Sequence, residues 1–541
     1  MLKTPLAALA TASTLALSLA QAAQAESASE AAQAIRREAG LPDRGPQGRP
    51  LPLAASWNTG TGKDGYDPDY QIRLIEQGHH LLPWFQLDYP EGRQNVPSPL
   101  RYYSSALKRC AALGLPISFI SSQWESPLSD SRQYAGLPAE LNPNVVDAQG
   151  EVEAKVSPFG ALEPWARVGQ EWTGQAIVRR LQTLYPNPPQ VLFLSNNEHR
   201  KLQWKDAPAD RRYPGGPRAG DESKRKAVGD GWIARYRALQ DGMREGLREP
   251  AWKSHALFVG YDAFGGAHFG RWAGWMEYSL YTQNRIDPWP LAWDGASVSY
   301  YTSDANPATD HTVWSPQIEA MNWVFMLDEA RRLNPGFWFE LSVWDGYQPG
   351  LPSDKRAYYA KFGQIYGSER YAGMVKFGMW LTRPRVVRDY RGSGQTVKDT
   401  EAYFLAVVRA VDEIHDNKLL AQFWRRGELA ANHNHAHPYQ DNIPKEYAGQ
   451  DRWFMLDTSF DPRRPWNLAT EIPIFALALA QGKPQKREWL VYAYSPARAR
   501  RKVSLTIPEH GPVEIDALPE GAYYYLLEKT NKIVRLAGGS Q

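Results

Sequence analysis

The feature of this sequence that most constrains its fold is a series of short apolar runs separated by longer amphipathic segments. The runs are rich in β-branched and aromatic residues, which is typical of buried parallel strands, and the segments between them have helical periodicity. The expected strands are Pro52–Trp57, His80–Leu87, Ile117–Ser121, Gln190–Ser195, Ala256–Tyr261, Ser297–Tyr301, Phe337–Leu341 and Gly373–Met379. The clearest expected helices are Pro99–Leu113, Gly231–Leu247, Ser315–Leu333 and Asp399–Ile414.

Eight strands with helices between them are the number that a closed barrel needs, and they predict an α/β chain folded as a (β/α)8 TIM barrel. The alternative is a doubly wound open sheet, which usually has fewer strands and a glycine-rich phosphate turn after the first strand. The residues that follow the first expected strand, Asn58 to Gly62, lack the spacing of a dinucleotide-binding turn. The barrel is therefore the preferred fold.

A chain of 541 residues is too long for one compact core, so a barrel with an appended domain is expected. After about Asp451 short alternating runs such as Trp489–Tyr494 and Arg501–Ile507 are separated by turn residues, which predicts an antiparallel β-sandwich. The expected divisions are a signal peptide over 1–25, a polar segment and linker over 26–50, the barrel over 51–450 and the C-terminal β-sandwich over 451–541.

The first 25 residues have the pattern of a cleavable export signal. Lys3 precedes an apolar run from Leu6 to Leu19, and the small residues of Ala23-Gln24-Ala25 predict cleavage after Ala25. The run is short for a membrane anchor, the chain becomes polar at Glu26, and we expect no membrane span after it. The pattern predicts a bacterial protein that is periplasmic or secreted.

Composition narrows the classes of partner. A formal net charge of +3 is too near balance to indicate a nucleic-acid partner. The chain has 21 Trp and 28 Tyr, and such rings stack on the C–H faces of sugars, although many of them are expected in the core. The single cysteine, Cys110, excludes an intrachain disulfide, and we expect it to be a buried small hydrophobe.

Two glutamates follow or end expected strands on opposite sides of the barrel. Glu198 lies in Leu194–Arg200 after the fourth strand, and Glu340 lies in Trp338–Trp344 at the seventh. Residues at the C-terminal ends of barrel strands converge on one pocket. Cleavage of a glycosidic bond needs two carboxyl groups, one protonated and one ionised, and a separation of about 5–5.5 Å implies retention of configuration.

Asn197-Glu198 at the fourth strand and a lone Glu340 at the seventh resemble the pattern of clan A retaining glycoside hydrolases. The resemblance covers residues 52–391, and it assigns neither a numbered family nor a sugar. It implies that Glu198 is the acid/base, that Glu340 is the nucleophile and that Asn197 holds the sugar 2-hydroxyl. The structural alternative for Glu340 is a buried carboxylate paired with Arg383 or Arg385.

The same resemblance implies a tyrosine beside the nucleophile, for which Tyr300 and Tyr301 are the candidates, and a tryptophan floor after the eighth strand, for which Trp380 is the candidate. Polar groups between aromatic rings are what a sugar-binding groove requires. On that ground the further candidates for substrate contacts at strand ends, each of which could equally be loop scaffolding, are Trp57, Asn58, Gln86, Trp124, Tyr261 and Trp344.

Two polar clusters have less specific interpretations. The insertion from His199 to Gly229 is basic and could bind an anionic polymer, but its own acidic residues favour a solvated loop. The histidines of His433-Asn434-His435-Ala436-His437 could bind a metal if they lay on a strand, but a loop without metal is favoured. We therefore expect no metal and no cofactor.

The sequence thus predicts a glycosidase that acts on a polysaccharide or oligosaccharide by a retaining double displacement. One alternative is a metal-dependent TIM-barrel hydrolase, which a chelator would inactivate. The other is a non-catalytic carbohydrate-binding protein on the same barrel, which would bind sugar without releasing product. The sugar, the linkage and endo or exo attack are left open.

Overall fold

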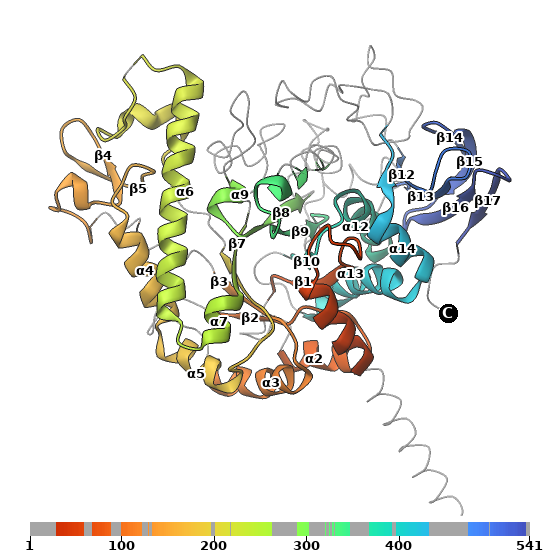
Figure 1. Cartoon of the computed structure of the whole chain (residues 1–541), viewed down its shortest axis with the longest axis horizontal. Coiled ribbons are helices and arrows are strands. Elements are labelled where there is room, and N and C mark those ends of the chain that lie inside the picture. The colour runs from red at the N-terminus through yellow and green to blue at the C-terminus, as the bar shows by residue number, and fades with distance from the viewer. Residues whose placement is uncertain are drawn as a thin grey trace, which may run out of the picture.

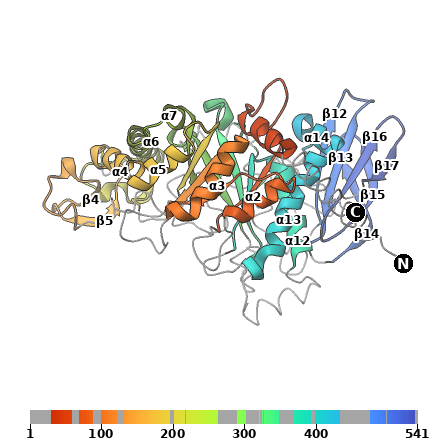
Figure 2. The same ribbon diagram turned by 90° about the horizontal axis from the view of Figure 1, so that it is seen from below.

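A computed structural model describes residues 29–58, 68–87, 99–121, 128, 132–195, 201–216, 218–261, 289–301, 320, 324, 327–328, 330–346, 367–391, 397–431, 474–496 and 498–536. The chain has three parts in space (Figure 1): an insertion with the long helix α6 at one end, a barrel in the middle and antiparallel sheets at the other end. The view from below shows the same order along the long axis (Figure 2).

Eight parallel strands form the barrel sheet in the order β1-β10-β9-β8-β7-β6-β3-β2. One parallel bridge, between Ala54 of β1 and Leu81 just before β2, nearly closes the sheet. The (β/α)8 fold predicted from the sequence is therefore confirmed. The barrel strands are β1 (Leu53–Ser56), β2 (Trp84–Gln86), β3 (Ile117–Ser121), β6 (Val191–Ser195), β7 (Ala256–Tyr261), β8 (Gly295–Tyr301), β9 (Trp338–Trp344) and β10 (Val386–Asp389).

Most of the helices lie in the segments whose amphipathic pattern predicted them. Several of them cover the outside of the barrel. Pro99–Leu113 forms α3 as expected, and α6 begins ten residues before the expected helix start at Gly231. The helices are α2 (Pro68–Glu76), α3 (Pro99–Leu113), α4 (Glu163–Thr173), α5 (Ala176–Leu184), α6 (Asp221–Gly246), α7 (Pro250–His255), α9 (Trp289–Ala292), α12 (Ser368–Thr382), α13 (Val397–Asp416) and α14 (Lys418–Arg426), with 3-10 turns η2 (Ala139–Leu141) and η3 (Trp204–Ala209).

The expected eighth strand, Gly373–Met379, is wrong: this segment is the middle of helix α12. The eighth strand is β10, which follows α12 in the chain. Almost every residue of α12 is buried, because the helix lies between the barrel and the C-terminal sheet. A helix that is covered on all sides has no polar face, so its apolar run cannot be distinguished from a buried strand by periodicity.

The insertion between β3 and β7 contains the hairpin β4 (Asn144–Val146) and β5 (Val152–Val156) and the packed helices α4 and α6. Glycines lie where these two helices touch. A Cβ on Gly169 would lie 2.1 Å from the Leu239 carbonyl oxygen, and a Cβ on Gly242 would lie 1.9 Å from that of Ala166. The two backbones therefore approach more closely than any other side chain allows.

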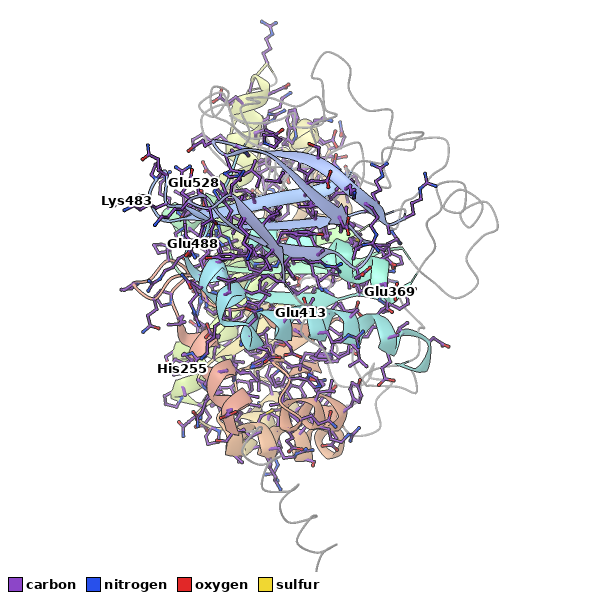
Figure 3. The ribbon with its side chains drawn as sticks, turned by 90° about the vertical axis from the view of Figure 1, so that its right-hand side faces the viewer. His255, Glu369, Glu413, Lys483, Glu488 and Glu528 are labelled. Carbon is purple, nitrogen blue, oxygen red and sulfur yellow. The ribbon has the colours of Figure 1, made fainter. Side chains whose placement is uncertain are left out.

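The C-terminal part forms the expected β-sandwich. A five-stranded antiparallel sheet in the order β11-β12-β13-β16-β17 faces the hairpin β14-β15 across its own apolar core. The other face of the five-stranded sheet packs on the barrel helices (Figure 3). The strands are β11 (Glu428–Leu429), β12 (Phe475–Gln481), β13 (Glu488–Tyr494), β14 (Arg500–Ile507), β15 (Gly511–Ala517), β16 (Ala522–Leu527) and β17 (Lys532–Arg535).

The short strand β11 precedes residue 451, so the sheet takes one strand from the segment that directly follows α14. The expected boundary at residue 451 lies in a stretch that the structure does not describe, and it stays a prediction. No helix among the described residues is long and apolar enough to span a bilayer.

Candidate functional site

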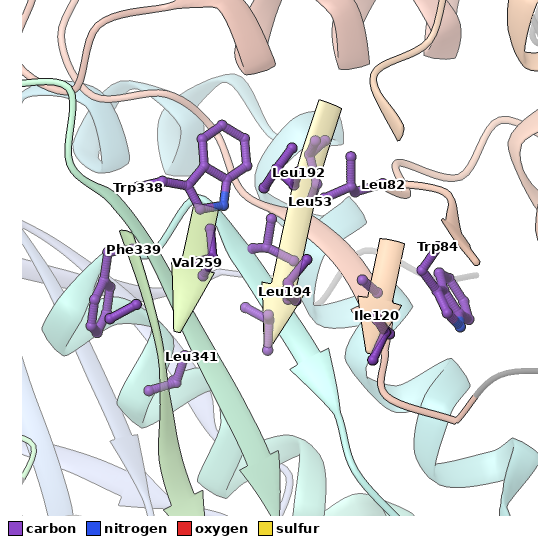
Figure 4. Close-up of a cluster of buried hydrophobic side chains, with 14 of the residues drawn as sticks. Leu53, Leu82, Trp84, Ile120, Leu192, Leu194, Val259, Trp338, Phe339 and Leu341 are labelled. Atoms are coloured by element: carbon purple, nitrogen blue, oxygen red, sulfur yellow. The ribbon is translucent and has the colours of Figure 1, made fainter. Parts of the chain in front are cut away.

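The lower part of the barrel interior is apolar. Leu53, Leu192, Leu194 and Val259 gather with the indole of Trp338 in Figure 4, and all are fully buried or nearly so. Side chains alternate along a strand, so Glu340, Ser342 and Trp344 share the Trp338 face of β9. Along β9, the side chains that face the barrel interior are therefore Trp338, then the carboxylate Glu340, then the hydroxyl of Ser342 and finally Trp344 at the C-terminal end.

Glu340 lies inside the barrel, fully buried, in an ion pair with Arg388 of β10. The Arg388 guanidinium donates from Nε to Oε2 at 2.8 Å and from Nη2 to Oε1 at 3.0 Å. Trp338 Nε1 also donates to Oε1, at 3.0 Å. Arg383 or Arg385 was the structural partner of Glu340 in the alternative interpretation of the sequence. Instead, Arg383 donates to the Gly427 carbonyl and Arg385 to the Leu41 carbonyl.

Two serine hydroxyls lie one layer above Glu340. Ser342 Oγ accepts a hydrogen bond from Trp57 Nε1 at 2.7 Å and lies 2.7 Å from the hydroxyl of Tyr301. Ser299 Oγ donates to the hydroxyl of Tyr261 at 2.7 Å. These bonds fix three aromatic side chains from three different strand ends to the inner wall of the barrel.

Five aromatic rings meet at the C-terminal ends of the strands, and we call them the mouth cluster: Trp57, Tyr261, Tyr301, Trp344 and Tyr390. Trp57 and Tyr261 meet edge to face at 5.5 Å, and Tyr301 stacks on Tyr390 at 5.3 Å. Trp344 stands edge-on to both tyrosines of that stack. The Arg388 guanidinium lies 5.5 Å from the Trp57 ring centre, which links the cluster to the ion pair below.

The mouth cluster lies well above Glu340. Trp344 lies four positions after Glu340 on β9, so at the usual strand rise their Cα atoms are about 13 Å apart. Trp344 is 8% exposed, whereas Trp57 and Tyr390 are half-buried. The described residues thus place a largely buried cluster of rings at the mouth, with Trp57 and Tyr390 partly exposed, and a fully buried carboxylate below it.

A buried network of charges behind the mouth holds the ends of β9 and β10. Arg391 donates to Asp389 at 3.0 Å and to Asp345 at 3.1 Å, and Asp345 also accepts from Arg370. Burial raises the pKa of Asp389, although Arg391 and Tyr371 oppose this shift. For Arg391, burial lowers the pKa, but Asp389, Tyr371 and Asp345 together outweigh burial and raise it. The sequence suggested that Asp345 is a turn residue, and the structure gives it this ion-paired position.

Several site residues expected from the sequence come together here. Trp57, Tyr261, Tyr301 and Trp344 are all members of the mouth cluster. Asn58 accepts the backbone N–H of Arg391 through Oδ1, which ties the end of β1 to that of β10. Gln86 ends β2 and is half-buried. The expected residues Glu198, Asn197 and Trp124 lie outside the described residues, as do the histidines at 433–437.

Two expected positions are wrong. The ring of Tyr300 points away from the barrel interior, and its hydroxyl donates to the Met374 carbonyl of α12. Trp380 does not follow the eighth strand: it lies in α12, fully buried, and donates from Nε1 to the Tyr523 hydroxyl at 2.9 Å. A side chain buried against the C-terminal sheet cannot form the floor of a sugar subsite at the mouth.

The sequence also missed four residues of this region: Arg388, Tyr390, Ser299 and Ser342. The first two lie on or after β10, which was assigned to the wrong segment. The serines are interior positions of β8 and β9, and only the register of those strands reveals that they face inward. Among the described residues no group of three His, Cys, Asp or Glu side chains could share a metal ion.

Comparison of the sequence with protein-family models finds no match. A search of curated proteins likewise finds none.

Solved structures that the chain resembles include the GH36 α-galactosidase AgaA of Geobacillus stearothermophilus in complex with raffinose, with 10% identity, a TM-score of 0.37, and coverage of 92% of this chain and 54% of that one. This chain thus spans about half of that enzyme's length. A modular endo-β-1,4-mannanase of Cellulomonas fimi has 12% identity, a TM-score of 0.34 and coverage of 90% and 97%.

A GH30 endoxylanase of Clostridium papyrosolvens has 8% identity, a TM-score of 0.35, and coverage of 88% of this chain and 95% of that one. Likenesses with TM-scores of 0.37 or less do not establish a shared activity.

Proposed function

We propose that this protein is a glycoside hydrolase that cleaves a polysaccharide or oligosaccharide at the mouth of the barrel. The proposed mechanism is a retaining double displacement, with Glu198 as acid/base and Glu340 as nucleophile, without metal or cofactor. Asn197 would hold the sugar 2-hydroxyl, and Trp57, Asn58, Gln86, Trp124, Tyr261, Tyr301 and Trp344 would contribute substrate contacts.

The observation that carries the proposal is the mouth cluster. Five rings from five strand ends converge at the face of a TIM barrel where substrates bind, and three of them carry hydrogen-bonded polar groups. Rings of this kind offer apolar faces to the C–H groups of a sugar and leave polar edges for its hydroxyls.

Arg388 has a defined part in this mechanism. Its two hydrogen bonds hold the Glu340 carboxylate in one orientation inside the barrel. Formation of a glycosyl ester would remove the negative charge of Glu340 and leave the buried Arg388 without its partner, which is costly. Arg388 therefore favours release of the carboxylate in the second step. A sugar reaches Glu340 only if it passes the Ser342 layer, since the glutamate is fully buried.

A non-catalytic carbohydrate-binding protein is the second candidate, and the burial of Glu340 favours it. Both Glu340 oxygens already accept hydrogen bonds, and Glu340 lies four positions before the end of β9. In this case the mouth cluster binds sugar, while Glu340 and Arg388 only stabilise the barrel.

Activity on a panel of bacterial, algal and plant polysaccharides separates the two candidates. For the enzyme we expect Glu340→Gln to lower kcat by about 10⁴-fold or more without rescue by azide. Glu198→Ala is expected to regain activity with azide, because a small anion can replace the water that the missing base would activate. Glu428→Gln, on the exposed strand β11, is the control. Full activity in either site variant contradicts the assignment.

A double variant, Glu340→Leu with Arg388→Met, distinguishes catalysis from structural support. Replacing both members of a buried ion pair by apolar groups is often neutral, whereas removing one member leaves a buried charge. If Glu340 is the nucleophile, the double variant folds like the wild type and has no activity. If it only supports the barrel, the double variant retains the binding or activity of the wild type.

We also propose that the protein is exported and then periplasmic or secreted, as the sequence of residues 1–25 suggests. Mass spectrometry of the protein purified from a bacterial host is expected to give a chain that begins at Glu26. An intact Met1 in the periplasmic or secreted fraction would contradict cleavage.

A further inference from the structure

A second region of concentrated charge lies at the opposite end of the barrel, beneath the starts of β1 and β10. We call it the arginine cluster: Arg49, Arg331, Arg383 and Arg385. Arg49 precedes β1, Arg383 and Arg385 precede β10, and Arg331 precedes β9. Arg331, Arg383 and Arg385 are each less than 10% exposed.

Two of these guanidinium groups form their described hydrogen bonds with neutral acceptors rather than with carboxylates. Arg383 donates to the carbonyls of Trp424 and Gly427, and Arg385 donates to those of Ala39 and Leu41. Those acceptors are neutral, so they satisfy hydrogen bonds and leave the charges in place.

Within the part of the chain that the structure describes, Arg331 is the one member with a buried carboxylate as ion-pair partner, Asp43. The guanidinium of Arg49 has no hydrogen bond or ion pair with any described residue, and its Nε is buried. Asp328 is half-exposed and forms ion pairs with both Arg331 and the exposed Arg44 at the edge of the cluster. Among the described residues, Asp43 is thus the one buried carboxylate in an ion pair with the four guanidinium groups, while Asp328, Glu428 and Glu38 act on them without such a buried pair.

The groups are close enough to affect one another. Burial, together with the charges of Arg331 and Arg44, lowers the pKa of Arg49 to about 10. Burial and the charge of Arg49 lower the pKa of Arg383 as well. Buried like charges persist in a fold when a counter-ion compensates them.

We propose that the arginine cluster binds a small oxyanion of the phosphate or sulfate class, recognised by Arg49 and by the neighbouring edge residue Arg44. A guanidinium presents a planar fork of donors that matches two oxygens of such an anion, and several forks can share one tetrahedral anion. Arg49 is half-buried and Arg44 is exposed, so the anion can reach the cluster from the outer side of residues 41–50. This site lies at the end of the barrel opposite to the mouth cluster, where side chains serve stability rather than catalysis.

The test uses the mature chain and inorganic phosphate. Thermal unfolding is measured at pH 7 in chloride and in phosphate at equal ionic strength, for the wild type, Arg49→Met and the control Arg426→Met, an exposed arginine on the nearby α14. Phosphate also stabilises proteins by exclusion from their surface, so the result is the difference between variants. We expect phosphate to raise the Tm of the wild type and of Arg426→Met by about 2 °C or more beyond that of Arg49→Met.

A second arm separates anion binding from a structural role of Arg49. In chloride, Arg49→Met is expected to unfold at or above the wild-type Tm, because the substitution removes an uncompensated charge. Phosphorus NMR of inorganic phosphate is expected to broaden with the wild type and not with Arg49→Met. The proposal is overturned if all three proteins respond equally to phosphate, or if Arg49→Met loses as much stability in chloride as in phosphate.

Discussion

At the residue scale, Ser342 is the small side chain that joins two rings of the mouth cluster. Its single hydroxyl binds both Trp57 Nε1 and the Tyr301 hydroxyl, so one small residue positions two rings of the mouth cluster. A buried donor that loses its acceptor cannot turn to water, and the cost is about 1–3 kcal/mol for each donor. The serine is therefore expected to matter more for stability than its size suggests.

We predict that Ser342→Ala lowers the free energy of unfolding by about 2 kcal/mol, because the Trp57 indole N–H loses its acceptor and the buried Tyr301 hydroxyl loses this hydrogen bond. Urea unfolding of the mature protein measures the change. Ser254→Ala is the matched control, since that hydroxyl is exposed and bonds only within α7. A loss no larger than that of the control would show that water replaces the Ser342 hydroxyl.

Histidines next to the bridge between Ala54 and Leu81 make the stability of the protein depend on pH. His79 and His80 both hydrogen-bond to Asp412 of α13. The distances are 2.7 Å from His79 Nδ1 to Asp412 Oδ2 and 2.8 Å from His80 Nδ1 to Asp412 Oδ1. The hydrogen bond to Asp412 raises the pKa of His79. Burial alone would raise the pKa of Asp412, but His79 and His80 outweigh burial and lower it to about 2. Burial lowers the pKa of His415, which stacks on His80, to about 3.

The signs of these shifts give a prediction. A raised pKa means that the His79 contribution is complete below about pH 6.5 and is lost as pH rises through the folded-state value. His79→Gln is therefore expected to destabilise the protein more at pH 5.5 than at pH 8.5, as measured by urea unfolding at both values. His415 acts in the opposite direction, because the folded state disfavours its protonated form below pH 6.5. An equal effect of His79→Gln at both pH values contradicts the pairing.

At the scale of elements, the contact between α4 and α6 depends on glycines rather than on apolar side chains. The backbone of each helix occupies the space that a Cβ of the other would need, at Gly169 and at Gly242. Helix propensity alone makes these glycines unexpected, because a glycine inside a helix costs about 1 kcal/mol of stability relative to alanine. The close approach of a second backbone explains why these positions carry glycine.

Gly242→Ala is accordingly expected to destabilise the protein by more than 2 kcal/mol, although alanine is the better helix former. Gly220→Ala, at the N-cap of α6 with nothing near its Cβ, is the control and is expected to cost no more than about 1 kcal/mol. Thermal unfolding of both variants checks the difference. Stabilisation by Gly242→Ala would mean that the helices can separate at little cost.

At the scale of the whole molecule, the barrel and the C-terminal sandwich share one apolar core. Phe377 of α12 packs against Phe475 and Tyr494 of the sheet, and Trp380 donates to Tyr523. The ion pair between Lys376 and Glu413 lies at the same interface (Figure 3). The second domain therefore covers a helix of the barrel that has no polar face of its own.

A chain that stops at residue 473 is expected to aggregate or to bind a hydrophobic dye, because α12 would expose its apolar residues to water. The soluble fraction and dye fluorescence measure this. The full chain with Tyr523→Phe is the control, since it loses the hydrogen bond from Trp380 while the C-terminal sheet still covers α12. A soluble truncated barrel with native helix content contradicts the shared core.

The sequence by itself predicted the barrel, because seven of its eight strands are buried runs that can be recognised, with the helices between them, without knowing how they pack. It also placed Trp57, Tyr261, Tyr301 and Trp344 at strand ends, since alternation and strand length locate those ends. Tertiary packing decided the rest. Helix α12 and Trp380 were misplaced because a helix covered on both sides loses its periodicity. The pairing of Glu340 with Arg388 arises only when β9 and β10 lie side by side, which no local pattern records.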